Sequence, residues 1–273
     1  MPERVIVVTG ATDGLGRSLS SALAHEPATR LILHGRDQAR LDDLAGSLAD
    51  AQASIQTVRA DFSELAQVHR VADEIAGLSD HLSVLVNNAG IGAGEPEGSD
   101  RRVTVDGNEL RFAVNHLAPF ALTQHLLPLL DRGAPARIVN VASIGQSPID
   151  LEDPSLEHGY TGVRAYGQSK LAMITTGFVL AGRLDPQRVT VNALHPATYM
   201  PTKMVMDSVG YSIDSLETGL NATLRLILAP ELEGVTGQFY DRTSVARAHP
   251  DAYNARIQQQ VWDLSTRLTM QPA

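Results

Sequence analysis

A tyrosine and a lysine in the second half of the chain have the spacing of an acid/base pair on a helix. Tyr166 and Lys170 stand four residues apart in AYGQSK, so a helix would place both side chains on one face. A tyrosine has an ordinary pKa of about 10, and lowering it to about 7 requires roughly 4 kcal/mol of extra stabilisation of the phenolate. A neighbouring ammonium can supply part of that. The same pair, taken alone, is also common on ordinary helix surfaces.

Three glycines near the start of the chain form a second pattern with chemical meaning. The run TGATDGLG places Gly10, Gly14 and Gly16 between a short apolar run and a helical pattern that begins near Arg17. Glycines in this place let the backbone turn tightly and approach a pyrophosphate, and the following helix offers unpaired N–H groups. A strand-to-helix turn without a ligand is the alternative, but the position after the first strand favours a bound dinucleotide.

Two polar residues stand where the surrounding sequence is apolar. Ser143 ends the run RIVNVAS, and Asn115 lies within FAVNHLAPF. A serine at the carboxyl end of a central strand would point into the ligand crevice of an open sheet, although it could instead satisfy its own backbone. An asparagine inside an apolar helix is unfavourable unless its amide finds partners. His116 beside it is interpreted as a packed histidine.

The elements that must position these residues alternate along the whole chain, as in a parallel sheet covered on both faces. Strands are predicted at residues 4–9, 30–34, 54–60, 83–87, 136–141, 188–194 and 237–240. Helices are predicted at residues 17–25, 39–48, 65–78, 107–131, 164–184, 216–228 and 253–268. Near-continuous apolar strands such as VIVV should be buried on both faces. The predicted fold is α/β, a single Rossmann-fold domain over residues 1–273 with a doubly wound seven-stranded parallel sheet.

Two segments break this rhythm and are predicted to be loops. Residues 92–106 are rich in glycine and acidic residues, and residues 146–163 carry Pro, Asp and Gly with little periodicity. Both follow strand ends, where open α/β sheets place their ligand crevice. We expect both to lie on the substrate side.

The residue after the second strand distinguishes between the two nicotinamide dinucleotides. Arg36 stands where a Rossmann fold contacts the adenosine ribose, and a guanidinium matches a 2′-phosphate in charge and geometry. Arg36 therefore favours NADP(H) over NAD(H). Asp13 and Asp37 count against NADP(H) unless their carboxylates point away. Arg40, one helical turn on, could add positive charge, but it is interpreted as a solvated helix residue.

Composition supports one globular domain and excludes several functions. The 273 residues are 43% hydrophobic and 19% charged, which fits an ordinary globular protein. The chain has no cysteine and opens without a signal-peptide pattern, so a cytoplasmic location is expected. No apolar run reaches the roughly 18 residues of a membrane helix. A net charge of −9 argues against general affinity for nucleic acid.

The motifs occur in the order that marks a known family. TGATDGLG, NNAG at residues 87–90, the serine of NVAS and the pair in AYGQSK resemble the short-chain dehydrogenase/reductase family, from Val5 to about Tyr240. VDGNELRFAVNHLAPFALT and QQQVWDLSTRL look like its retinol dehydrogenase-like, WW-domain oxidoreductase-like and protochlorophyllide reductase-like branch. The resemblance implies an NADP(H)-dependent oxidoreductase that interconverts a carbonyl and an alcohol.

The resemblance also implies roles for four catalytic residues. Tyr166 would protonate a ketone or aldehyde oxygen as hydride arrives from NADPH, and Lys170 would tune that tyrosine. Ser143 would hold the same oxygen. Asn115 would help to hold a water that links Lys170 to solvent. A positioned acid and a hydride donor complete the reduction, so no metal is expected.

The implied cofactor site draws on the ends of several strands. Its residues are Gly10, Thr12, Asp13, Gly14, Leu15, Gly16, Arg36, Asp61, Phe62, Asn88, Ala89, Gly90, Tyr166, Lys170, Pro196, Ala197 and Thr198. Asp61 resembles the family aspartate that contacts adenine. It could equally be a helix N-cap, because Glu64 stands three residues later as in a capping box.

The chain departs from the family pattern in two places. Between Ser143 and Tyr166 lie 22 residues, an insertion that makes about 144–163 a substrate loop, and Ser147 is the alternative if Ser143 is not the catalytic serine. After the sixth strand the chain reads HPATYMPTKM, with Ala197 where the family has glycine. Either Thr198 or Thr202 would contact phosphate there.

The segment at about 197–215 corresponds to the mobile substrate lid of the family. Its methionines can adapt to varied ligands, although methionine is also ordinary helix filling. A bulky, largely apolar carbonyl or alcohol is the favoured substrate. Two other functions stay open on the same scaffold: a non-redox enzyme such as a cyclase or epimerase, and a dinucleotide-binding regulatory protein. Many relatives form homodimers through the helices at about 107–131 and 164–184, although monomers occur in this branch.

Overall fold

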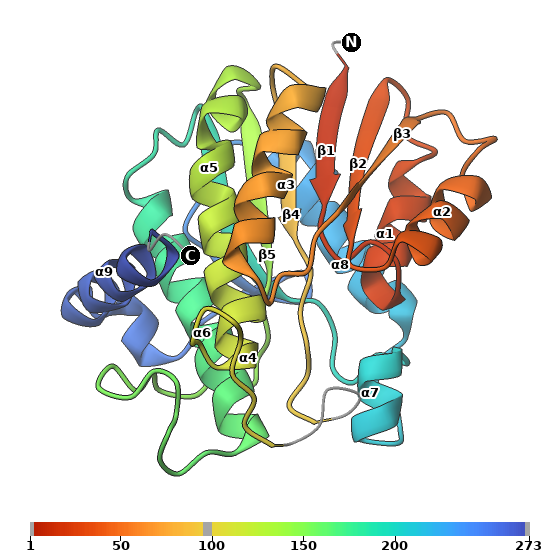
Figure 1. The fold of residues 1–273 in the computed structure, drawn as a ribbon. Coiled ribbons are helices and arrows are strands. Elements are labelled where there is room, and N and C mark those ends of the chain that lie inside the picture. The colour runs from red at the N-terminus through yellow and green to blue at the C-terminus, as the bar shows by residue number, and fades with distance from the viewer. Residues whose placement is uncertain (1–2, 95–99, 271–273) are drawn as a thin grey trace.

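One mostly parallel sheet crosses the centre of the molecule in the computed structural model, which describes residues 3–94 and 100–270 (Figure 1). In these residues the strands lie in the order β3-β2-β1-β4-β5-β6-β7-β8. Their bounds are β1 (Arg4–Val8), β2 (Thr29–Gly35), β3 (Ser54–Arg59), β4 (Val84–Asn87), β5 (Ala136–Val141), β6 (Val189–His195), β7 (Phe239–Asp241) and β8 (Ser244–Ala246). The order reverses between β1 and β4, which is where an open α/β sheet forms its ligand crevice.

The seven parallel strands predicted from the sequence are confirmed, and an eighth strand was not predicted. β8 pairs antiparallel with β7 across a tight turn in which Arg242 has a φ of 55°. Three residues are too few to show a period, and the β8 side chains are exposed or half-buried. This strand therefore has no apolar signal in the sequence.

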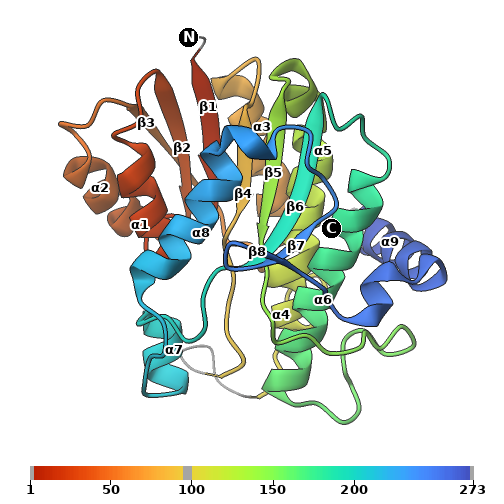
Figure 2. The ribbon, with the colours of Figure 1, turned by 180° about the vertical axis from the view of Figure 1, so that it is seen from behind.

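Helices cover both faces of the sheet. α3, α5 and α6 lie on the face that Figure 1 shows, and α1, α2 and α8 lie on the face that Figure 2 shows. The bounds are α1 (Gly14–Leu23), α2 (Gln38–Ser47), α3 (Leu65–Leu78), α4 (Leu110–Phe112), α5 (Ala118–Arg132), α6 (Gly162–Ala181), α7 (Lys203–Ser208), α8 (Leu216–Leu228) and α9 (Ala255–Thr269). Short 3₁₀ turns add Pro230–Leu232 and Pro250–Tyr253.

The sheet is buried on both sides, as its apolar strands predict. Residues 5–8 of β1 have no exposed surface. Val5 and Val7 belong to the core under α3 and α5, whereas Ile6 and Val8 belong to the core under α1 and α8. Alternate residues of one strand thus supply both cores, which fixes the register of the central strands. Within the described ranges, no helix combines the length and apolar character that crossing a membrane requires.

The helix predicted at 107–131 is interrupted where Asn115 stands. It begins as α4, passes through a π-helical turn over Ala113–Leu117 and continues as α5. Pro119 has no N–H, so it cannot donate the α-helical hydrogen bond to the carbonyl of Asn115. Such π turns are frequent at functional sites. The π turn therefore identifies the segment around Asn115 as a candidate part of a functional site.

The last helix, α9, packs across the helices at which a homodimer was expected. Trp262 contacts Phe120 of α5 edge to face, with ring centroids 5.1 Å apart, and lies 3.9 Å from the guanidinium of Arg183. The ring of His116 is buried, as interpreted from the sequence, and its Nε2 lies 2.7 Å from the Ser265 hydroxyl. Part of the expected dimer surface is therefore covered by the chain's own helix, and the homodimer stays a prediction.

Candidate active site

The four candidate catalytic residues meet at the carboxyl end of β5. Ser143 follows that strand, and Tyr166 and Lys170 lie one turn apart on α6. Ser143 hydrogen-bonds the Tyr166 side chain, and Lys170 Nζ donates to the carbonyl of Val141, 3.0 Å away. Lys170 Nζ lies 5.8 Å from the centre of the Tyr166 ring. The structure thus brings together the Ser143 hydroxyl, the Tyr166 phenol and the Lys170 ammonium, although 22 residues separate Ser143 from Tyr166 in the sequence.

Ser147, the alternative serine, lies elsewhere in the same loop. A Cβ at Gly167 would meet the Ser147 hydroxyl at 2.3 Å, so Ser147 packs on the next residue of α6. Ser143 Oγ accepts a hydrogen bond from the Gly145 N–H at 3.0 Å and also reaches Tyr166. Of the two serines, Ser143 is therefore the one whose hydroxyl lies beside the Tyr166 side chain.

The surroundings of Tyr166 keep its hydroxyl protonated. Burial raises the pKa of Tyr166, the hydrogen bond with Ser143 lowers it, and the nearby Tyr199 phenol raises it. The net pKa shift is upward, opposite to the lowering that acid/base work near neutrality requires. For acid/base work, the lowering of the Tyr166 pKa would have to come from the charge of bound ligands together with Lys170, whereas a protonated phenol suits a proton donor.

Burial gives Lys170 a pH-dependent effect on stability. Desolvation lowers the pKa of Lys170 to about 8, below its ordinary value of 10.5. The unfolded chain therefore binds more protons than the folded protein between these values, and stability rises with pH through this window. We expect the free energy of unfolding of the wild type to increase by up to about 3 kcal/mol relative to Lys170→Met between pH 7.5 and pH 10.5.

Urea denaturation of both proteins across this pH range measures the difference. Groups distant from Lys170 titrate equally in the two proteins, so their contributions cancel, and Tyr166 stays protonated in this window because burial raises its pKa. A difference that does not change with pH would show that Lys170 keeps its ordinary pKa in the fold.

Asn115 supports the loop after β4 with both ends of its amide. Its Oδ1 accepts from the Ile91 N–H at 2.8 Å, and its Nδ2 donates to the Ile91 carbonyl at 3.1 Å and to Ser169 Oγ at 3.0 Å. Ser169 in turn donates to the backbone carbonyl of Tyr166 at 2.7 Å. The amide therefore finds the partners that an asparagine in an apolar helix needs. A Cβ at Gly90 would lie 3.2 Å from Asn115 Oδ1 and 3.4 Å from Lys170 Nζ.

The glycine turn, residues 9–16, has the backbone that a pyrophosphate site needs. Gly10 and Gly14 have φ values of 64° and 48°, in the left-handed region that favours glycine. Gly16 packs so closely that a Cβ would lie 2.0 Å from the Gly10 carbonyl oxygen. Leu15 fills the core below the turn, and α1 begins at Gly14. These residues fit a dinucleotide phosphate, because the start of α1 presents its N–H groups beside an open backbone.

The NNAG segment holds this turn in place. Asn88 Nδ2 donates to the carbonyls of Thr9 and Gly10, at 2.8 and 3.1 Å. The N–H groups of Asn88 and Ala89 both donate to the Thr9 hydroxyl at 3.0 Å. Asn87 lies deeper and donates to Asn140 Oδ1 at 2.8 Å. The NNAG segment therefore supports the glycine turn as well as the sheet.

A buried histidine that the sequence did not single out also supports the turn. His34 Nδ1 accepts from the Gly10 N–H at 3.3 Å, and Nε2 donates to the Ala60 carbonyl at 3.0 Å. Burial lowers the pKa of His34 to about 4, so the ring is neutral and can accept that bond. Phe62 stacks on this ring at 4.0 Å and is itself buried. Phe62 thus packs beneath the turn.

The capping-box interpretation of Asp61 and Glu64 is wrong. Glu64 is the N-cap of α3 and makes no side-chain capping bond. Asp61 Oδ1 instead accepts from the Ser63 N–H at 2.9 Å, and the carboxylate that reaches the first turn of α3 is that of Asp106, 2.8 Å from the Leu65 N–H. A carboxylate from 41 residues away occupies the place of the local cap.

The two acids that counted against a 2′-phosphate beside Arg36 are already engaged. Asp37 caps α2, accepting from the Arg40 N–H at 3.2 Å. Asp13 caps α1 and pairs with Arg40 Nη1 at 3.2 Å. Arg40 is exposed on α2, in agreement with its interpretation as a solvated helix residue, and it also forms a surface ion pair with Asp13. Arg36 lies exposed at the same end of the sheet.

The segment after β6 separates the two threonines. The Thr198 hydroxyl lies 3.1 Å from His195 Nε2 and accepts from Arg242 at 3.2 Å, which turns it toward β7. Thr202 faces the glycine turn, because a Cβ at Gly14 would meet its methyl group at 2.9 Å. The Thr202 methyl group therefore lies against the glycine turn, while its hydroxyl caps α7, and which threonine contacts a phosphate stays a prediction.

The lid, residues 197–215, closes on itself and reaches the loop after β4. Ile213 N–H donates to the Tyr199 carbonyl at 3.0 Å, and the rings of Tyr199 and Tyr211 meet edge to face at 5.7 Å. A Cβ at Gly92 would touch the Met204 side chain at 2.8 Å. Residues 95–99 of the predicted loop 92–106 lie outside the described residues.

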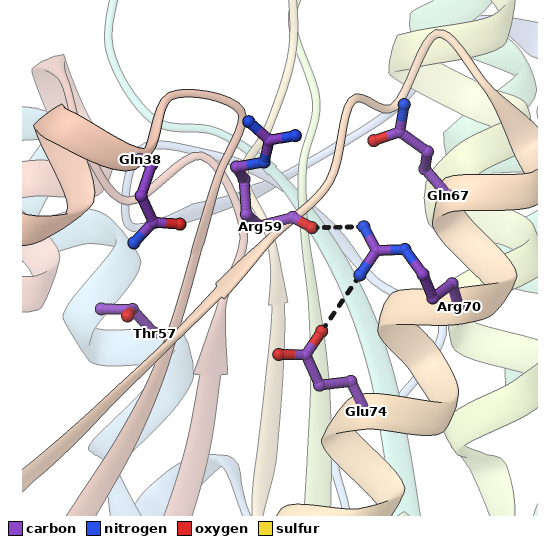
Figure 3. Close-up of a pocket in the computed structure, with 6 residues that line it drawn as sticks. All are labelled: Gln38, Thr57, Arg59, Gln67, Arg70 and Glu74. Atoms are coloured by element: carbon purple, nitrogen blue, oxygen red, sulfur yellow. Dashed lines mark hydrogen bonds and ion pairs between the residues drawn. The ribbon is translucent and has the colours of Figure 1, made fainter.

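A shallow polar cavity of about 400 Å³ lies apart from this site, at the outer edge of β3 (Figure 3). Arg70 of α3 donates to the Arg59 carbonyl at 2.7 Å and to Glu74 at 3.3 Å. Gln38, Thr57 and Gln67 complete its lining. Charged side chains at an edge strand discourage pairing with another sheet, which is a sufficient role for this group.

Sequence reasoning missed three residues behind the site. Glu109 and Arg111 are fully buried at the start of α4, and the Tyr160 hydroxyl bridges them. The sequence did indicate a buried charged pair, because ELR places Glu109 and Arg111 at the beginning of a segment that is otherwise apolar. Which partners would neutralise them could not be inferred without the fold.

Comparison with known proteins places the chain in a family. Residues 4–210 match the family described as short chain dehydrogenase, so the chain belongs to the short-chain dehydrogenase/reductase family. Retinol dehydrogenase 14 of Mus musculus is 32% identical over 294 aligned positions, which cover 97% of this chain and 85% of that protein. The human WW domain-containing oxidoreductase is 30% identical over 97% of this chain and 68% of its own length. These relatives define the branch that the sequence motifs indicated.

Solved structures agree with the fold. The Pseudomonas aeruginosa RhlG/NADP active-site complex superimposes with a TM-score of 0.71 and 27% identity, over 88% of this chain and 95% of that one. The carbonyl reductase Sniffer of D. melanogaster gives a TM-score of 0.66 and 25% identity, over 91% and 100% of the two chains. The chain is an oxidoreductase of this family and has the Rossmann fold with which the family binds nicotinamide dinucleotides.

Proposed function

We propose that the protein is an NADP(H)-dependent oxidoreductase that interconverts a carbonyl and an alcohol, with Tyr166 as the acid/base. The observation that carries this proposal is the hydrogen-bonded pair of Ser143 and Tyr166, with Lys170 one turn away, beside a glycine turn that fits a dinucleotide. Membership of an oxidoreductase family supports it. Bound NADPH would supply the hydride.

The protein's own residues then hold the substrate oxygen and transfer the proton to it. Ser143 holds the substrate oxygen, and the Tyr166 hydroxyl donates its proton to that oxygen as the carbon is reduced. The Lys170 ammonium stabilises the phenolate that remains. Asn115 keeps the loop after β4 against α6, and Gly90 lies between Asn115 and Lys170. Pro196 and Ala197 remain proposed contacts of the nicotinamide amide. In the oxidising direction the phenolate accepts the alcohol proton.

The rim of the site supports an apolar substrate. Tyr199, Met206, Tyr211 and Ile213 of the lid and Ile144 of the loop after β5 are exposed large hydrophobic side chains. Exposed apolar groups near a crevice favour a ligand that covers them. We propose a bulky, largely apolar ketone, aldehyde or quinone-like carbonyl, bounded by the described part of the loop after β4, by the loop 144–163 and by the lid. The cytoplasmic location expected from the sequence stays a prediction.

The decisive experiment follows NADPH absorbance against a panel of such carbonyls. Consumption of NADPH in proportion to alcohol formed supports the proposal. Conversion of a substrate without net consumption of NADPH would favour a cyclase or epimerase. Tight NADPH binding with no turnover on any member of the panel would favour a regulatory protein.

We expect Arg36 to decide the cofactor. Loss of a charge-assisted bond to the 2′-phosphate costs about 1.5–3 kcal/mol, so Arg36→Ala should weaken NADPH binding by about 10- to 100-fold and leave NADH binding within a few-fold. Separate calorimetric titrations of NADPH and NADH measure this. Arg256→Ala, an exposed arginine on α9, is the control. Equal changes for the two cofactors would remove the role assigned to Arg36.

A further inference from the structure

A buried guanidinium lies directly behind the candidate active site. Arg111 of α4 has no exposed surface, and its Nε donates to the Gly92 carbonyl at 2.7 Å. Its Nη1 donates to the Tyr160 hydroxyl at 2.7 Å, and that hydroxyl donates to Glu109 Oε1 at 3.2 Å. Glu109 is also fully buried, lies 3.7 Å from the guanidinium and caps the helix through the Phe112 N–H.

Burying the Arg111 guanidinium and the Glu109 carboxylate has a large desolvation cost, so other interactions must compensate for it. Removing two charges from water costs more than their attraction returns unless further hydrogen bonds satisfy them. Here the extra bonds come from two different loops, at Gly92 and at Tyr160. The network joins the loop after β4, the inserted loop 144–163 and the helix that carries Asn115.

Arg111 and Asn115 hold adjacent residues of one loop. They stand four residues apart on the same helix, and Asn115 binds both backbone groups of Ile91 while Arg111 binds the carbonyl of Gly92. Gly90 precedes Ile91 and Gly92, and an added Cβ at Gly90 would lie 3.4 Å from Lys170 Nζ, at van der Waals contact. A shift of this loop would therefore move the wall against which the ammonium lies.

The inserted loop is fixed at its other side to the catalytic helix. The buried Gln168 of α6 donates to the Pro154 carbonyl at 2.8 Å and accepts from the Asp150 N–H at 3.3 Å. Asp150 also pairs with Arg164 of α6 at 2.8 Å. The loop therefore connects α6, which carries Tyr166, to the Arg111 network.

We propose that Arg111 is a positioning residue that, through Tyr160 and Gly92, holds the loop at 90–92 in register with Tyr166 and Lys170. The proposal rests on the proposed function for its catalytic consequence, but the structural link exists without turnover. The long insertion 144–163 is then a fixed wall of the substrate site.

The first test measures the link itself by hydrogen–deuterium exchange. Tyr160→Phe removes one hydroxyl, and the double variant Arg111→Gln/Glu109→Gln removes both buried charges together. We expect exchange in a peptide covering 88–94 to accelerate at least 10-fold in the double variant and several-fold in Tyr160→Phe. Tyr253→Phe, a tyrosine near α9, is the matched control and should leave this peptide unchanged. Unchanged exchange at 88–94 in both network variants would overturn the proposal.

The second test measures the catalytic consequence with the carbonyl substrate that the wild type reduces. A misalignment of about 1 Å can cost on the order of 100-fold in rate, so we expect kcat to fall by about that factor in the double variant, with NADPH affinity within a few-fold. The apparent pKa in the pH profile of kcat should also move, which a loss of folded protein would not cause. A kcat that falls only in proportion to the folded fraction would refute the positioning role. Failure of the wild type to reduce any carbonyl refutes the proposed function instead and leaves the exchange test decisive.

Discussion

Tyr166→Phe is expected to lower kcat/KM for carbonyl reduction by about 1000-fold, within the 100- to 10,000-fold range of general acid–base catalysis. The variant keeps the ring but loses the hydroxyl that hydrogen-bonds Ser143 and gives up the proton. NADPH affinity should stay within a few-fold, because the glycine turn lies on other elements. Steady-state kinetics together with a direct NADPH titration measure both quantities.

The control for this prediction is Tyr253→Phe, whose phenol accepts from the Ala248 N–H away from the site. It should keep wild-type kcat/KM. The free energy of unfolding shows whether Tyr166→Phe loses activity through its chemistry or through unfolding. Burial raises the pKa of Tyr166, so the hydroxyl is neutral in the fold and its removal should change the free energy of unfolding by no more than about 1 kcal/mol. Unchanged turnover in Tyr166→Phe would contradict the mechanism.

Gly16→Ala is expected to damage both stability and cofactor binding. Its Cβ would lie 2.0 Å from the Gly10 carbonyl oxygen and 2.6 Å from Asn88 Nδ2, so the turn must open. Overpacking against backbone costs about 1–3 kcal/mol, or a Tm lower by roughly 3–10 °C in a protein of this size. Because the same turn presents the N–H groups for the pyrophosphate, NADPH affinity of the folded protein should fall at least about 10-fold. Thermal unfolding and calorimetry test the two effects.

Two other glycines supply matched controls. Gly46 in α2 has no atom within 4 Å of the position that a Cβ would take, so Gly46→Ala should stabilise the protein by about 0.5–1 kcal/mol through helix propensity. A Cβ at Gly133 would lie 2.1 Å from the Leu82 carbonyl, far along the chain from the turn. Gly133→Ala should therefore destabilise the protein without weakening NADPH binding. If Gly16→Ala behaved like either control, the turn would not be the phosphate site.

The correctly predicted features are those that depend on local pattern. Near-continuous apolar runs predicted the central strands such as β1 and β6, because strands covered by helices on both faces must be apolar throughout. The order of TGATDGLG, NNAG, NVAS and AYGQSK identified the family, since the first three each stand at the end of a particular strand and the last lies on the helix that follows. The spacing of Tyr166 and Lys170 set their shared helix face.

The features that were missed or misassigned depend on partners distant in the chain. Asp106 displaced the expected local cap of α3 from 41 residues away, and Asp13 paired with Arg40 across 27 residues. β8 formed only because β7 offered an edge. In each case a side chain or strand had several local solutions, and the tertiary contact selected one.

The sequence by itself determined the fold, the family and the identity of the four candidate catalytic residues, because periodicity and motif order depend on neighbouring positions. The tertiary structure decided how these residues are held. It directed Thr198 toward Arg242 and Thr202 toward the glycine turn, and it joined Gly92 to Tyr160 through one buried guanidinium. A buried charge is stable only when enough partners converge on it. Those partners come from three separate loops and helices, so only the folded chain could show that the inserted loop is fastened to the active site.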